Sequence, residues 1–457
     1  KHIPEFPDYG APITLRHLIH HTSGIRDYLT LMDLAGARED DYYVDGEVVE
    51  LLARQKELNF QPGADHLYSN SGYFLLSEIV RRVTGKPMSA YAREKIFQPL
   101  GMKNTHFHDD HTMVVRNRAV GYSPKKGGGF RIHTTPLDMI GDGGVFTCVD
   151  DLLLWERNFA KNRLGRRDPE LIEKMHTRGK LNSGEELDYA FGLVVSEHKG
   201  LKMVHHGGAF AGYRAEMIRF PEEAFSVIVL ANLSSINPSR LAQQVADIYL
   251  EDRIIEEKEE PVEEPHFVEL PEAELRKKTG AYHNKKTDAL LEVVFEEGKL
   301  WVDTFSFRFE VAPLSPERFL SVDRSLGVEV VFEPRRGGKP PRLHLKRGEE
   351  KKADTYDAVA WEVISPDQLS DYVGEYFSEE LQVTCRILVE KERLFIRHEN
   401  PYKNYPRDPL KPTLKDRFVV EGIHLKFFRD RTGRIISFTA NAGRVKNIRF
   451  DKRRSRP

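Results

Sequence analysis

Two short stretches of the sequence carry side chains that could take part in acyl or proton transfer. In the first, Tyr68, Ser69 and Asn70 come directly before an apolar segment with helical spacing. Free N–H groups at the start of a helix favour negative charge, so a tyrosine there can act as a general base. Asn70 offers an acceptor and donors, which suit it to hold an amide. Taken alone, the triplet is more typical of a helix cap beside a packed tyrosine.

The second stretch is a strand-like segment that ends in His205, His206, Gly207 and Gly208 before another strand begins. Glycines let a second backbone approach closely. A strand edge beside a hydrogen-bonding side chain can bind an extended acyl substrate by main-chain pairing. The alternative is a glycine-rich hairpin with solvated histidines, so this stretch also needs a partner before it indicates a site.

A third cluster contains His106, His108 and His111 in the string HFHDDH. Its spacing resembles that of zinc hydrolases of the metallo-β-lactamase fold, in which imidazoles and a carboxylate bind zinc. Such a site needs an apolar strand before it and further ligands downstream, whereas here the string follows QPLGMKNT, a helix end and turn. A surface histidine cluster is therefore favoured over a zinc hydrolase, and no metal is predicted.

The segments that must position these side chains alternate helical and strand-like patterns. The spacing predicts a short helix in ITLRHLIHHTSGI, with Thr14 as its N-cap and Gly24 as its end, and a longer, largely buried helix ended by Gly85 and Pro87. The runs FGLVVSE, LKMVHH, YRAEMIRF and FSVIVLANL indicate an antiparallel meander, and SRLAQQVADIYLEDR indicates an amphipathic helix. Helices around an antiparallel sheet predict an α+β domain over residues 1–254.

The composition changes beyond this domain. EEKEEPVEEP, within residues 255–268, is rich in acidic residues and proline, so we predict a solvated linker, with a charged helix end as the alternative. Two similar units follow, at residues 269–361 and 362–457. The Gly-x-Tyr pair of LRKKTGAYH in the first unit recurs in LSDYVGEYF of the second, and a later apolar run recurs at the same distance along the chain. Their alternating pattern predicts a duplicated all-β domain, each copy a small barrel or closed meander.

Composition and charge exclude several classes of partner. The 457 residues are 40% hydrophobic and 31% charged, and 69 Lys and Arg balance 71 Asp and Glu. Balanced charge gives no reason to expect a nucleic acid, and no apolar run is long enough to span a membrane. The two cysteines, Cys148 and Cys385, form neither a disulfide framework nor a metal cluster, so both are predicted to be packing residues.

Four collinear segments within residues 1–254 resemble the serine β-lactamase and penicillin-binding-protein superfamily, in particular its class C-type esterases, D-aminopeptidases and β-lactamase-related peptidases. ITLRHLIHHTSGI resembles that branch's ITIRHLLTHTSGL, and GDGGVFTCVDDLLLW resembles its GAGGLYSTAEDLARW. The stretch from YSNSGY to PLGMKNTHF resembles its Tyr-x-Asn segment, and HGGAFAGY resembles its His-x-Gly form of the Lys-Thr-Gly motif. The resemblance implies an α/β sandwich with an antiparallel sheet, followed here by two barrel-like domains.

The same resemblance implies a role for each matching residue. Tyr68 would relay the proton of the nucleophile, and Asn70 would hold the substrate amide. His206 would occupy the place of the motif's lysine, and the spacing to the following Gly-Tyr favours it over its neighbour. Gly208 would let the substrate lie along the strand, and the N–H of Ala209 would supply half of an oxyanion hole, a donor worth about 3 kcal/mol.

The chain departs from the family pattern at the nucleophile. The family's serine belongs to a Ser-x-x-Lys motif that precedes the first matched segment, and this chain begins after that point. Two Ser-x-x-Lys strings, from Ser123 and from Ser196, follow Tyr68 instead of preceding it and are expected by chance. The resemblance therefore implies that the nucleophile and its lysine are absent from this chain, which is either a piece of an intact enzyme or a pseudoenzyme. Either way, we expect this chain to be inactive alone.

The resemblance implies a hydrolase of amide or ester bonds that works through an acyl-enzyme and needs no cofactor. Its partner would be a small D-amino-acid peptide, ester or β-lactam-like substrate, with no nucleic acid and no membrane span. A homo-oligomer is compatible with the sequence, and the family favours a periplasmic or secreted location.

The alternative function is a non-catalytic binding module that retains the cleft. By the same resemblance to D-aminopeptidase-like members, in which one of two C-terminal β-barrels reaches the active site, the proline-rich segment ENPYKNYPRDPLKP, residues 399–412, would restrict substrate size.

Overall fold

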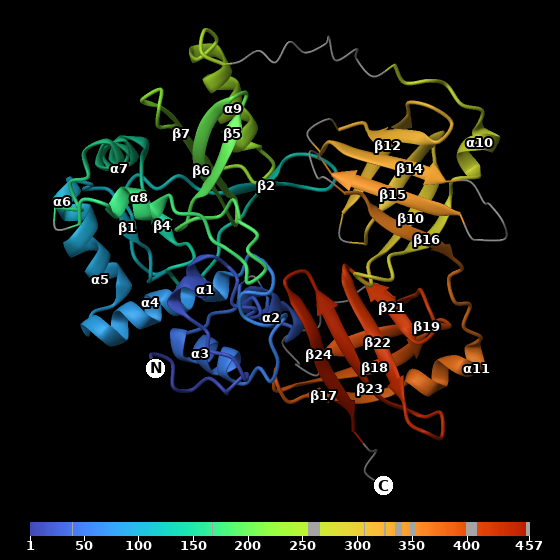
Figure 1. Cartoon of the computed structure of the whole chain (residues 1–457). Helices are drawn as coiled ribbons and strands as arrows, with labels where there is room; N and C mark the ends of the chain where they lie inside the picture. The colour runs from blue at the N-terminus through green and yellow to red at the C-terminus, as the bar shows by residue number, and fades with distance from the viewer. Residues whose placement is uncertain are drawn as a thin grey trace. The chain divides into compact units, whose positions relative to one another are not determined.

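The fold comes from a computed structural model, which forms two compact units, Lys1–Glu257 and Lys258–Pro457 (Figure 1). The first unit combines helices with sheets, and the second is built mainly of strands. The acidic stretch and most of the proline-rich segment lie outside the described residues, so the linker and the finer domain boundaries remain predictions. The described residues are 1–38, 40–166, 168–254, 266–305, 307–323, 326–333, 341–347, 352–398 and 409–453.

The main sheet of the first unit is the antiparallel meander predicted from the sequence. Its strands, in spatial order, are β5 (Val194–His198), β6 (Leu201–Phe210), β7 (Tyr213–Phe220) and β8 (Phe225–Ala231). Successive side chains of a strand point to opposite faces. On β6, Met203 therefore packs with residues of α9 (Pro238–Tyr249), and Val204 packs with a residue of α7 (Val149–Lys161). The sheet thus has α9 on one face and α7 on the other.

The remaining elements of the first unit are short, apart from one long helix. The small strands form two pairs, β1 with β4 and β2 with β3. Within the described residues, no helix has the length and apolar character needed to cross a membrane. The elements are α1 (Leu15–Ile19), α2 (Tyr28–Leu34), α3 (Asp45–Ala53), α4 (Asn70–Thr84), α5 (Met88–Ala92), a π-helical turn (Arg93–Phe97), α6 (Gln98–Leu100), β1 (His106–Phe107), β2 (Tyr122–Pro124), β3 (Phe130–Ile132), β4 (Val145–Phe146) and α8 (Leu171–Met175).

The helix boundaries follow the predicted capping signals at three of four ends. Thr14 caps α1 by accepting a hydrogen bond from the His17 N–H at 3.1 Å. The predicted end at Gly24 is wrong, because the chain leaves the helix at Ile19 and His21 takes a left-handed conformation with φ 54°. Helix α4 begins at the Tyr-x-Asn segment and ends, as predicted, at Gly85, whose φ is 71°.

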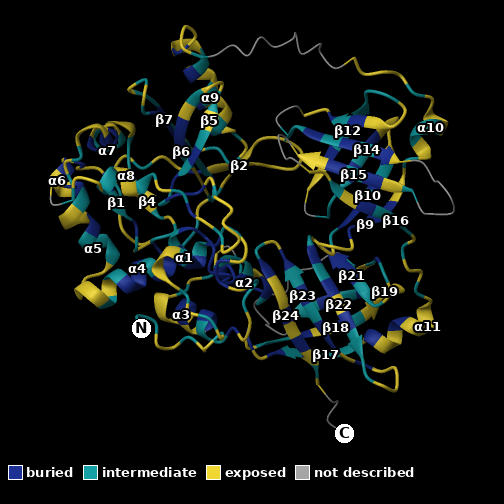
Figure 2. Cartoon of the chain, in the orientation of Figure 1, coloured by how far each residue is buried: buried dark blue, intermediate teal, exposed yellow. Residues whose placement is uncertain are grey.

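The first barrel of the second unit is closed by eight antiparallel strands. Helix α10 (Glu272–Arg276) precedes it, and the last strand pairs with the first. Alternate side chains point inward and fill the barrel with apolar residues, seen as the dark positions along its strands in Figure 2. The strands are β9 (Gly280–His283), β10 (Leu290–Glu296), β11 (Lys299–Asp303), β12 (Arg308–Pro313), β13 (Arg318–Ser321), β14 (Val328–Glu333), β15 (Arg342–Arg347) and β16 (Asp354–Val359).

The second eight-stranded sheet repeats this topology in the same strand order, which confirms the predicted all-β units. Within the described residues, its end strands, β19 and β20, do not form a ladder, but next to β20 the Leu410 N–H donates to the Leu394 carbonyl of β19 at 2.7 Å. The elements are α11 (Pro366–Leu369), a 3₁₀ turn (Ser370–Tyr372), β17 (Gly374–Ser378), β18 (Val383–Glu390), β19 (Arg393–His398), β20 (Lys411–Pro412), β21 (Arg417–Val420), β22 (Ile423–Arg429), β23 (Ile435–Ala442) and β24 (Val445–Lys452).

The two Gly-x-Tyr pairs have the same local geometry. Gly280 and Gly374 begin β9 and β17 with φ 147° and 152°, a region that other residues rarely adopt. The tyrosine two residues later donates its hydroxyl to the carbonyl four residues upstream in each copy, at 3.0 Å for Tyr282 and 2.7 Å for Tyr376. The repeat seen in the sequence is therefore a repeat of structure.

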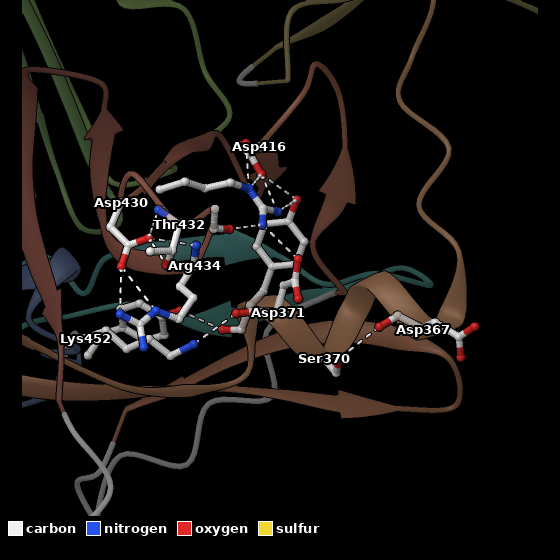
Figure 3. Close-up of polar contacts among 12 residues, drawn as sticks. Asp367, Ser370, Asp371, Asp416, Asp430, Thr432, Arg434 and Lys452 are labelled. Carbon is white, nitrogen blue, oxygen red and sulfur yellow. Dashed lines mark hydrogen bonds and ion pairs between the residues drawn. The ribbon is translucent and has the colours of Figure 1, made fainter.

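Polar contacts tie the helical entry segment of the second sheet to its strands. Asp371, in the 3₁₀ turn, accepts a hydrogen bond from Arg429 of β22 at 2.8 Å, and its carbonyl accepts one from Lys452 of β24 at 2.9 Å. Arg429 also donates to Asp416, which lies with Asp371 and Lys452 in the network of Figure 3. These contacts hold the turn and give Arg429 a structural role.

Candidate active site

The start of α4 is fixed by a buried carboxylate. Asp27, the N-cap of α2, accepts a hydrogen bond from the Thr30 N–H at 3.1 Å through one oxygen. Its other oxygen accepts from the Asn70 N–H at 2.8 Å. Ser71 makes a second link, because its hydroxyl donates to the Arg26 carbonyl at 2.7 Å. The first turn of α4, and with it Tyr68 and Asn70, is thereby attached to the beginning of α2.

The edge of β6 is open at the histidine–glycine stretch. Strand β5 pairs with β6 only along Leu201–His205, whereas β7 pairs with it as far as Phe210. Among the described residues, no strand pairs with the other edge of β6 from His206 onward. Gly207, Gly208 and Ala209 are exposed there. Such an edge can accept an extended segment by main-chain pairing.

Packing inside the protein does not require a glycine at position 208, so the space beside Gly208 is available to a ligand. A Cβ at position 208 would lie 3.6 Å from the Ala215 side chain, an ordinary contact distance. A Cβ at position 207 would instead lie 2.9 Å from a carboxylate oxygen of Glu216. Glycine at 207 therefore makes room for the Glu216 side chain. A Cβ at 208 would therefore fit the fold, on the exposed part of the strand.

Strand alternation separates the two neighbouring histidines. His205 shares the α9 face of the sheet with Glu216 of β7, and its Nδ1 lies 3.4 Å from a Glu216 oxygen. Ser239 of α9 donates a hydrogen bond to the same carboxylate. His206 points to the opposite face, where Val204 packs with α7. The structure therefore places His206, and not His205, on the side of the helices.

An aromatic cluster brings Tyr68 and His206 together. Their ring centroids are 6.4 Å apart. Tyr68 packs at 4.1 Å on His21, which packs at 4.6 Å on Tyr189. The Tyr189 hydroxyl lies 3.2 Å from Nε2 of His206. The Ser69 N–H donates to Nδ1 of His21 at 3.2 Å, so His21 also holds the backbone beside Tyr68. Tyr68, His21, Tyr189 and His206 are called the aromatic cluster below.

Sequence reasoning missed two members of the aromatic cluster. His21 lies one helical turn from His17 in the sequence, a spacing that predicts polar packing, and its buried ring does pack, but against Tyr68 itself. Tyr189 lies in an irregular segment just before β5, where no periodicity marks it. The only available signal for His21 was its place in the matched segment HHTSG.

Burial controls the charge of the site. Burial raises the pKa of Tyr73 to about 12, and burial with neighbouring phenols raises the pKa of Tyr189 still further. Burial lowers the pKa of His206, because the imidazolium form loses its hydration. At neutral pH these groups are uncharged hydrogen-bonding partners. Within the described residues, no hydrogen bond engages the side-chain amide of Asn70, which leaves it available to a ligand.

The two Ser-x-x-Lys strings do not have the geometry of a nucleophile with its base. Ser123 lies in β2 and Ser196 in β5, whereas the motif needs a helix to bring residues three apart to one face. The Ser123 hydroxyl is hydrogen bonded to Nδ1 of His133 at 2.6 Å and to Ser234 at 2.7 Å. Lys199, the partner of Ser196, pairs with Asp247 at 3.0 Å.

The histidines of HFHDDH are engaged in separate contacts. His108 stacks on Phe146 at 4.1 Å, and His111 binds Asp138 through Nδ1 at 2.8 Å. His106 contacts His108 with 3.4 Å between ring nitrogens. In the described part of the chain, no three His, Cys, Asp or Glu side chains form a group that could hold a metal ion. The geometry gives the zinc alternative no support.

The family model for beta-lactamases matches residues 1–249, which is more than half of the chain. The chain belongs to the beta-lactamase family. The match covers both the Tyr-x-Asn start of α4 and the open edge of β6. The beta-lactamase fold, followed by two eight-stranded β units, is therefore the architecture of this protein.

Several relatives in this family are D-aminopeptidases. That of Gluconobacter oxydans (strain 621H) is 30% identical over 230 residues, 50% of this chain and 43% of the relative. That of Brucella canis is 29% identical over 231 residues, with the same coverage. The matched part thus spans less than half the length of these relatives. Family membership and these similarities support a hydrolase in general terms.

One solved structure resembles most of the chain. The octameric penicillin-binding protein homologue from Pyrococcus abyssi superposes with a TM-score of 0.50 and 24% identity, covering 78% of this chain and 81% of that one. At this identity the similarity concerns the fold alone. It extends beyond the beta-lactamase domain and includes part of the second unit.

Proposed function

We propose that this chain provides most of the active site of a serine hydrolase that cleaves amide or ester bonds of D-amino-acid peptides or related substrates through an acyl-enzyme. The observation that carries the proposal is the approach of Tyr68 and His206, with ring centroids 6.4 Å apart, beside the open edge of β6. The nucleophilic serine and its lysine would come from residues outside this chain. The D-aminopeptidase relatives favour D-amino-acid substrates over β-lactams.

Each side chain has a role that its surroundings suit. Tyr68 lies beside the N-terminus of α4 and within the aromatic cluster with His206, so it would accept the proton of the nucleophile. Asn70, whose side-chain amide makes no hydrogen bond within the described residues, would hold the substrate amide. A substrate would pair with β6 from His206 onward, passing Gly208, and the N–H of Ala209 would bind the developing oxyanion.

Covalent labelling with a fluorophosphonate or a fluorescent penicillin tests this proposal. A version of the protein extended upstream of Lys1 should label, whereas the present chain should not label through a family nucleophile. In the extended protein, Tyr68→Phe should slow labelling by about 10²–10⁴-fold, the usual contribution of a general base. Tyr9→Phe is the control, because its hydroxyl donates to the Gln55 carbonyl away from the aromatic cluster.

Gly208→Val separates ligand access from folding. The variant should keep its melting temperature, since the Cβ fits beside Ala215, but it should block the open edge and reduce labelling. An extended protein that binds D-alanine amide without ever labelling would identify the alternative function, a non-catalytic binding module. Labelling that maps to Ser123 or Ser196 would contradict the proposed source of the nucleophile.

A further inference from the structure

Both ring nitrogens of His206 are engaged by the protein. Nδ1 lies 2.7 Å from the carbonyl oxygen of Gly207, which can only accept a hydrogen bond. Nδ1 must therefore carry a proton. Nε2 lies 3.2 Å from the hydroxyl of Tyr189, and in a neutral imidazole protonated at Nδ1 this nitrogen is an acceptor. The geometry thus selects one tautomer, provided that Tyr189 supplies the donor.

The surroundings of Tyr189 suit its hydroxyl to donate the hydrogen bond to Nε2 of His206. Its side chain is 7% exposed, and its carbonyl accepts a hydrogen bond from the Gly179 N–H at 2.8 Å. A bridge to Val194 joins it to the start of β5, next to the pairing of Val194 with β6. Its ring packs edge-on against His21. A phenol in these apolar and aromatic surroundings keeps its proton. Tyr73 is a second neighbour of this hydroxyl, but its own proton goes to the Ile19 carbonyl. Nε2 of His206, 3.2 Å from the Tyr189 oxygen, is the acceptor that we assign to Tyr189.

We propose that Tyr189 is the positioning residue for His206: its hydroxyl holds the imidazole neutral, with the proton on Nδ1 and the ring turned toward Tyr68. The catalytic meaning of this role rests on the proposed function, but the hydrogen-bond arrangement does not. With both nitrogens occupied, His206 presents neither a positive charge nor a free N–H to a substrate. The site then has no fixed cation at this position for a substrate carboxylate and suits neutral amides and esters.

Long-range ¹H–¹⁵N correlation spectra of the uniformly labelled full chain test the arrangement directly. His206→Gln identifies the His206 resonances by difference. In the parent protein, at a pH where His206 is neutral, Nδ1 should be protonated and Nε2 unprotonated. Tyr189→Phe removes one hydrogen bond worth ~1 kcal/mol, so the ratio of the Nδ1–H to the Nε2–H form should fall about fivefold and the Nε2 resonance should move.

Tyr9→Phe is the control for this experiment. It also removes a phenolic hydroxyl of the first unit, but one that donates to the Gln55 carbonyl at 2.9 Å, so the His206 resonances should stay in place. A proton on Nε2 in the parent protein would overturn the proposal, and this measurement needs no variant of Tyr189. Identical His206 resonances in the Tyr189→Phe and parent proteins would also overturn it.

The outcome is independent of the labelling experiment. If the extended protein never labels while Tyr189→Phe shifts the tautomer of His206, the proposed function fails and the positioning role stands. If the extended protein labels while His206 does not respond to Tyr189→Phe, the positioning role fails alone.

Discussion

The buried carboxyl of Asp142 should make the stability of this protein fall with rising pH, and Asp142→Asn should remove that fall. Asp142 accepts a hydrogen bond from the hydroxyl of Tyr28, a fully buried residue of α2, at 3.0 Å. Burial is the main reason that its pKa rises from 3.8 to about 7; the Tyr28 hydrogen bond lowers it, and Asp27 and Asp45 raise it further.

The sign and size of the effect follow from the two pKa values. The unfolded chain loses the Asp142 proton near pH 4, whereas the folded protein keeps it until about pH 7. Stability therefore declines between these pH values and the loss is complete above pH 7. At about 1.36 kcal/mol for each pH unit between the two values, ionised Asp142 costs the folded state roughly 4 kcal/mol.

Calorimetric melting of the full chain at pH 4 to 8 measures this cost. Asparagine is neutral at every pH and still accepts from Tyr28. Asp142→Asn should match the parent at pH 4 and melt roughly 8–16 °C higher at pH 8, since 1 kcal/mol shifts a unit of this size by about 2–4 °C. Asp252→Asn, at an exposed position, is the control and should follow the parent throughout. A constant difference between Asp142→Asn and the parent over the whole pH range would refute the reasoning.

Two further substitutions test how the first unit is packed. Gly72→Ala should destabilise the protein by ~1–3 kcal/mol in urea unfolding, although alanine normally favours a helix, because its Cβ would lie 2.8 Å from the Leu18 carbonyl of α1; a stabilised variant would show that α1 and α4 can separate freely. Arg219→Met should cost ~3–5 kcal/mol by leaving Glu156 buried without its partner, and Arg219→Met with Glu156→Leu should recover most of that loss; equal losses in the single and double variants would contradict the ion-pair argument.

Local patterns in the sequence were sufficient for most of the secondary structure. The four strands of the meander, the helix that begins at Asn70 and the two β units depend on hydrophobic periodicity and on turns, which are properties of neighbouring residues. The predictions failed where contacts with another segment of the chain decide the burial of a residue or the end of a helix. Val83 has the spacing of a buried position on α4 but is 64% exposed, because the last turn of the helix turns this side chain to the surface. Gly24 was assigned as a helix end although the chain turns earlier, at His21.

The sequence alone determined which residue types could form a site and that a strand would carry His205 and His206 to opposite faces. The tertiary structure decided which of these faces meets Tyr68, since that depends on how the sheet packs between α9 and the helices that precede it. It also supplied Asp27 and Tyr189, whose partners are distant in the chain. Contacts of this kind leave no periodic trace in the sequence, because each depends on the packing of several elements at once.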